Sequence, residues 1–77
     1  MEDIQKMCVV RSAENNIYIG YLYGMDDKGL SMIKHVLKVE CEQSITDIAE
    51  NGVRNGNVTV VGDVVWMLIK EYCPCKI

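Results

Sequence analysis

Residues 17–26 have the sequence IYIGYLYGMD, and they decide the fold that we expect. Isoleucine and tyrosine favour a pleated, half-buried backbone, so this stretch predicts a long β-strand. Gly20 and Gly24 are four residues apart and therefore face the same side of that strand. Glycine inside a strand indicates a sharp bend or the close approach of another backbone. A long, bent strand is typical of a small closed barrel, whose strands must kink at the corners.

The length of 77 residues predicts one domain that spans residues 1–77. A chain this short buries only about 60% of the surface that its unfolded form exposes, and its stability alone is marginal. The hydrophobic fraction is 49%, which is high for so small a protein. We therefore expect part of the apolar surface to contact other subunits.

The formal net charge of −3 argues against general attraction to nucleic acid, and we expect no DNA binding. A local RNA site built by several subunits remains compatible with this charge. No signal peptide is evident, and the longest apolar run, residues 64–69, is too short to span a bilayer. We expect a soluble protein of the nucleus or cytoplasm, with reduced cysteines and no membrane contact.

The order of turn signals predicts further strands on both sides of residues 17–26. Residues 1–6 form either one helical turn or a disordered segment, and residues 7–13 form a first strand. Asparagines in residues 14–16 and Gly29 after two aspartates predict turns. Residues 30–41 are interpreted as a third strand, although residues 30–37 also fit helical spacing.

The second half of the chain has weaker signals. Residues 42–57 contain two Asn-Gly pairs and few apolar anchors, so we expect a loop or the outer end of a hairpin. Residues 58–61 form a short strand that Gly62 and Asp63 interrupt, and residues 64–69 form another strand that is apolar on both faces. Such a strand is covered on both sides, most simply by another chain. Residues 70–77 are expected to be a polar tail.

Two segments together resemble a known family. Residues 20–26, GYLYGMD, are similar to the first motif of the Sm and Sm-like (LSm) proteins, and residues 60–68, VVGDVVWML, are similar to the second. The chain is identified as a divergent member of this family. The resemblance implies an all-β fold, in which a short N-terminal helix precedes a five-stranded, strongly bent antiparallel barrel of the SH3 type.

The resemblance also implies a ring of Sm or LSm subunits, in which the fourth strand of one subunit pairs with the fifth strand of its neighbour. It places six residues at the subunit interface: Val58, Val60, Val65, Trp66, Met67 and Leu68. Such rings hold single-stranded, often uridine-rich RNA, and they act in pre-mRNA splicing or RNA decay.

The family holds one base per subunit with residues from the loops that follow the two motifs. The corresponding residues here are Asp26, Lys28, Leu30, Ser31, Val61, Gly62 and Asp63. The family usually has Asn where this chain has Leu30, or Ser31 if the turn is one residue longer. It usually has Arg where this chain has Val61. Valine cannot stack as a plane or donate a hydrogen bond, so we expect a weak grip on the base.

Several other residues could have a functional role, but a structural role explains each of them more simply. His35 fits a half-buried strand position, and Trp66 fits packing in a core or an interface better than an exposed stacking platform. Cys73 and Cys75 are separated by a single proline, which is tight for zinc ligands, so we expect free thiols.

No nucleophile–base pair and no glycine-rich phosphate loop is evident, and we expect neither enzyme activity nor a cofactor. Two alternative functions remain open. One is an Sm-fold scaffold without RNA contact, and the other is a small SH3-like module that binds a protein.

Overall fold

The computed structural model describes residues 7–76, so the helical turn expected in residues 1–6 lies outside the described residues. The chain forms one antiparallel sheet and one short helix, which confirms the all-β expectation. The elements in chain order are β1 (Met7–Ser12), β2 (Ile17–Met25), β3 (Ser31–Glu40), α1 (Ile45–Asn51), β4 (Asn57–Met67) and β5 (Ile69–Pro74).

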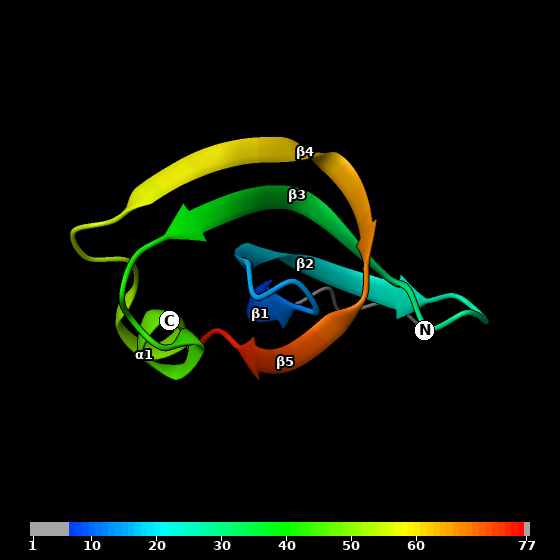
Figure 1. The fold of residues 1–77 in the computed structure, drawn as a ribbon, viewed down its shortest axis with the longest axis horizontal. Coiled ribbons are helices and arrows are strands. Elements are labelled where there is room, and N and C mark those ends of the chain that lie inside the picture. The colour runs from blue at the N-terminus through cyan, green and yellow to red at the C-terminus, as the bar shows by residue number, and fades with distance from the viewer. Residues whose placement is uncertain (1–6, 77) are drawn as a thin grey trace.

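The five strands follow the order β4-β3-β2-β1-β5 in the sheet. Figure 1 shows β3 and β4 curving over β2 and β1, with β5 on the far side of β1. The β1–β2 turn places Asn15 at a φ of 72°, which asparagine tolerates better than most residues. The predicted turns at residues 14–16 and 26–29 are therefore both confirmed.

The two glycines of β2 differ in their surroundings. A Cβ atom on Gly20 would lie 2.5 Å from Ile33 Cγ2 and 2.9 Å from the Lys34 carbonyl oxygen, whereas a Cβ on Gly24 would meet nothing within 4 Å. The pairing of β2 with β3 shifts register beside each glycine. Gly20 is therefore required by a close approach of β3, as the sequence predicts.

Strand β1 is buried on both faces. Cys8, Val9 and Val10 are consecutive, and each is fully buried. Val9 packs in a first cluster with Ile17, Val39 and the apolar side of α1, which we call the helix-side cluster. Cys8 and Val10 pack in a second cluster with Ile33, Val36 and Met67, which we call the inner cluster.

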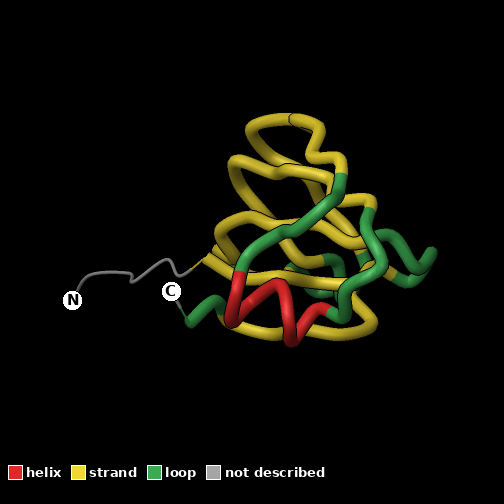
Figure 2. Tube along the Cα trace, turned by 90° about the vertical axis from the view of Figure 1, so that its left-hand side faces the viewer, coloured by secondary structure: helices red, strands yellow, loops and turns green. Residues whose placement is uncertain are grey.

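The expectation of a loop throughout residues 42–57 was wrong, because residues 45–51 form α1. Ser44 caps this helix, since its Oγ accepts a hydrogen bond from the Asp47 backbone N–H at 3.1 Å. Ile45, Ile48 and Ala49 lie on one side of the helix and are buried against the sheet. Figure 2 shows α1 lying across the strands at one end of the molecule. Tertiary burial of these three apolar residues thus outweighs the turn signals around them.

A polar network holds the segment that follows α1. The Asp47 carboxylate accepts hydrogen bonds from the Gln43 side chain at 2.8 Å and from Arg54 at 2.7 Å. Gln43 Oε1 in turn accepts the Arg54 backbone N–H at 2.6 Å. The hydrogen bonds from Gln43 and Asn51, together with the Arg54 charge, lower the pKa of the Asp47 carboxyl group. The loop between α1 and β4 is therefore tied to the helix.

The predicted break at Gly62 and Asp63 is also wrong, because both residues lie inside β4. The strand is interrupted at Leu68 instead, between β4 and β5. The Leu68 carbonyl accepts a hydrogen bond from the Ala13 N–H at 2.9 Å. Val61 is an extra residue in β4, because Val36 pairs with Gly62 and Leu37 pairs with Val60. This extra residue forms a β-bulge. Residues 69–74, expected to be mostly tail, form β5 along β1, with Val9 opposite Cys73.

His35 is exposed, contrary to the half-buried position expected for it. Its φ is 55°. Ile19 pairs with Leu37 and Tyr21 pairs with Lys34, so between these pairs β3 has one residue more than β2. The additional residue has to leave the regular pleat, and this turns the His35 side chain out of the sheet interior.

Candidate functional site

The turn after β2 is organised by the carboxylate of Asp26. Asp26 Oδ1 accepts the backbone N–H groups of Lys28 and Leu30, both at 2.9 Å. The Asp26 N–H donates to the Leu30 carbonyl at 2.9 Å, and Gly29 has a φ of 89°. This carboxylate therefore fixes the turn and presents the Lys28 side chain at its exposed tip.

The junction between β4 and β5 lies at the same end of the sheet as this turn. Ser31, the first residue of β3, pairs with Met25 on one side and with Met67 on the other. Ser31 is buried between these neighbours. The turn that follows β2 and the junction at Leu68 are therefore neighbours.

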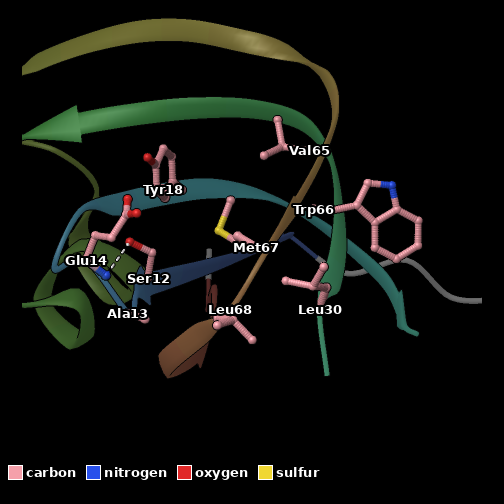
Figure 3. Close-up of a pocket in the computed structure, with 9 residues that line it drawn as sticks. All are labelled: Ser12, Ala13, Glu14, Tyr18, Leu30, Val65, Trp66, Met67 and Leu68. Carbon is pink, nitrogen blue, oxygen red and sulfur yellow. Dashed lines mark hydrogen bonds between the residues drawn. The ribbon is translucent and has the colours of Figure 1, made fainter. Parts of the chain in front are cut away.

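A cavity of about 330 Å³ lies between Leu30, the end of β4 and the β1–β2 turn. It is lined by Ser12, Ala13 and Glu14 from the β1–β2 turn, by Tyr18 and Leu30, and by Val65, Trp66, Met67 and Leu68. In Figure 3, Tyr18 and Met67 point into the space between the strands, whereas the Trp66 indole lies on the outer side of the β4 bend.

The cavity offers one kind of chemistry. Its walls are mainly apolar, and its charged group is the exposed Glu14 carboxylate. Ser12 Oγ is occupied, because it accepts the N–H groups of Glu14 and Asn16, each at 3.3 Å. The cavity suits a flat, apolar group that carries hydrogen-bond donors.

The structure does not bring Val61, Gly62 and Asp63 to this cavity. These residues lie in the middle of β4, where Gly62 pairs with Val36. Val36 is five residues from Ser31, which corresponds to about 17 Å along the strand. The two halves of the sequence-predicted RNA site are therefore separated within one chain, because the glycine of the second motif belongs to a strand and not to a turn.

Sequence reasoning missed Glu14 and Tyr18 as lining residues. No local signal in the sequence brings the β1–β2 turn against β4, since the contact depends on how far the sheet curves. Four residues that were predicted at the subunit interface also line the cavity: Val65, Trp66, Met67 and Leu68.

The remaining interface residues have different environments. Strand β4 is at one end of the strand order, and its Val58 and Val60 are exposed, Val60 by 76%. Val65 is half-buried against the inner cluster, and Met67 is part of that cluster. The Met67 side chain therefore belongs to this chain's own core.

Three of the four free cysteines surround the helix-side cluster: Cys41, Cys73 and Cys75. Cys8 is on the other face of β1, where burial raises the pKa of its thiol to about 11, with the nearby Cys75 as a second cause. Within residues 7–76, no group of three or more His, Cys, Asp or Glu side chains is placed to hold a metal ion.

Comparisons with known proteins found no matching family model, no matching curated protein and no matching solved structure. No helix in the described part of the chain is long and apolar enough to cross a membrane.

Proposed function

We propose that this chain is a subunit of an Sm-like ring that binds single-stranded, uridine-rich RNA in pre-mRNA splicing or RNA decay. The observation that carries the proposal is the sheet order β4-β3-β2-β1-β5, which leaves β4 and β5 as the two outermost strands. An Sm-like barrel requires this arrangement, in which the bent sheet is completed by its neighbours.

The exposed side of β4 supports assembly. Residues 7–76 supply no strand to pair with the outer edge of β4 or of β5. Valines at positions 58, 60, 61 and 64 of β4 are all exposed. A long, apolar edge strand of this kind is an aggregation hazard unless another strand covers it. Pairing β4 of one subunit with β5 of the next covers both edges, and the head-to-tail contact closes as a ring.

The cavity beside the β2–β3 turn supports RNA as the ligand. A uracil base is flat and carries an N–H group that can donate a hydrogen bond to the Glu14 carboxylate, while Leu30 and Leu68 supply apolar contact. Lys28 at the tip of the turn is placed to meet a phosphate. In this proposal the base lies near the Leu68 junction and not near Val61.

The ring is tested by size-exclusion chromatography with light scattering, on the protein alone and with co-expressed partners. A ring-sized particle is expected in at least one condition. Native mass spectrometry of the complex from its own cells then identifies the subunits and any bound RNA. A folded protein that stays monomeric in both conditions would contradict the ring and would favour an SH3-like module.

A scaffold without RNA contact is the second candidate function. Leu30 and Val61 favour it, because neither side chain can donate a hydrogen bond to a base. The two candidates differ in the effect of Lys28→Ala on the assembled complex. If Lys28 contacts phosphate, the variant binds RNA more weakly and the salt slope falls by roughly one unit. An unchanged affinity and slope indicate a scaffold.

A further inference from the structure

One aromatic–cation pair and one aromatic pair lie side by side on β2 and β3. Lys34 Nζ is 4.3 Å from the centroid of the Tyr23 ring, within the range of a cation–π interaction. The Tyr21 and His35 rings meet edge to face, with centroids 6.1 Å apart and an interplanar angle of 89°. Tyr21 is also the register partner of Lys34, so the four side chains form one continuous patch.

The patch is on the face of the sheet opposite the inner cluster. Leu22 lies between the two tyrosines and packs against that cluster, and Ile33, which precedes Lys34, is fully buried within it. Alternate residues of a strand point to opposite faces, so the aromatic–cation patch faces outward. Tyr23 is 39% exposed, and His35 is exposed as well.

His35 is held there at a conformational cost. Its φ of 55° is in the left-handed region, which residues other than glycine rarely adopt. Strained backbone of this kind persists where the surrounding structure imposes it, and it is concentrated at functional sites. The bulge that imposes it turns His35 toward Tyr21 on the outer face.

The chemistry of the patch matches single-stranded RNA. Exposed aromatic rings stack on bases without regard to their sequence, and neighbouring cations meet the phosphates. The patch is also continuous with the candidate site, since Tyr23 is two residues before Met25, where β2 enters the turn that presents Lys28. An RNA strand leaving that turn along β2 passes over Tyr23 and Lys34.

We propose that Tyr21, Tyr23, Lys34 and His35 form a stacking platform for the nucleotides next to the one held at the β2–β3 turn. This inference rests on the proposed function and adds a second contact surface to it. Bases stack on the two tyrosines, and Lys34 neutralises a phosphate between them.

The test measures the affinity of the complete complex for fluorescent oligouridylates of about 4 and about 16 nucleotides, by fluorescence anisotropy. Tyr23→Ala and Lys34→Ala should each weaken binding of the long oligonucleotide by about tenfold, because each removes a contact outside the turn. Neither change should affect the short oligonucleotide, which the turn holds alone. Tyr23→Phe keeps the ring and should bind as the original chain does.

Lys38→Ala is the matched control, because it removes the same charge from the same strand at a side chain that the platform does not include. Thermal melts of each variant establish that the fold is kept. Equal binding of the long oligonucleotide by the original chain, Tyr23→Ala and Lys34→Ala would overturn the platform and leave the proposed function intact. Loss of a protein partner in these variants, with unchanged RNA affinity, would also overturn the platform and leave the proposed function intact. Failure of the original complex to bind either oligonucleotide would overturn both proposals.

Discussion

His35 occupies a position in β3 that a β-branched residue cannot take without strain, since its φ is 55°. His35→Val should therefore lower the free energy of unfolding by about 1–2 kcal/mol, although the side chain is exposed. His35→Gly should stay within about 1 kcal/mol of the original, because relief of strain opposes the greater freedom of the unfolded chain. Urea titration measures both. Equal losses in the two variants would show that the backbone is not strained.

Cys8 gives the stability of the protein a dependence on alkaline pH. The unfolded chain releases the thiol proton near pH 9, whereas the folded chain keeps it until its pKa of about 11. The free energy of unfolding therefore falls as the pH rises through this range, by up to about 2–3 kcal/mol. The Cys8→Ala variant lacks this thiol, so its free energy of unfolding should fall less over the same range. The curves of unfolding free energy against pH for the variant and the original chain should therefore converge above pH 9. Parallel curves in urea titrations would contradict this prediction.

At the scale of elements, Gly20 and Gly24 give a matched pair of substitutions within β2. Gly20→Ala should lower the free energy of unfolding by about 1–3 kcal/mol, because the new methyl group meets Ile33 and the Lys34 carbonyl. Gly24→Ala meets no atom within 4 Å and should leave stability within about 0.5 kcal/mol. Thermal or urea unfolding of the two variants is the measurement. A similar loss in both would indicate that backbone freedom, and not the close approach of β3, explains Gly20.

Strands β2 and β3 could be predicted from sequence because the β-branched and aromatic residues of β2 agree with the turn residues on both sides of it. The helix α1 could not, since Ile45, Ile48 and Ala49 are too few to outweigh two Asn-Gly pairs until the sheet supplies a surface to bury them. Gly62 was misjudged for a related reason. A glycine beside a bulge in its own strand has the same local appearance in the sequence as a glycine in a turn.

The candidate site was predicted only in its first half. Asp26 and Lys28 lie where a local turn signal places them, because an aspartate that bonds its own backbone needs no distant partner. The second half depends on which residues of β4 lie beside Ser31, and pairing register is set by the whole sheet. The motif match therefore included Val61, which lies within β4, whereas Trp66 and Leu68 line the cavity.

For the whole molecule, the exposed edge of β4 predicts how the proposed assembly can be disrupted. Val60→Lys should weaken association with other subunits, because a charged side chain on an edge strand opposes strand pairing. The fold itself should change by about 0.5 kcal/mol or less, since Val60 is 76% exposed.

Sedimentation velocity of the complex measures this loss of assembly. Met25→Lys is the control, because Met25 is 69% exposed and belongs to an inner strand. Complexes of equal size in both variants would mean that β4 is not the contact edge.

The burial of β1 on both faces has a consequence for synthesis. Val9 is made early, yet β1 is flanked in the sheet by β5, whose residues 69–74 are made some sixty positions later. While the chain is being translated, Cys8, Val9 and Val10 therefore have one unpaired edge until β5 has left the ribosome. Of the three inner strands, β1 therefore waits longest for its second neighbour, and its unpaired apolar edge is an aggregation hazard during that time.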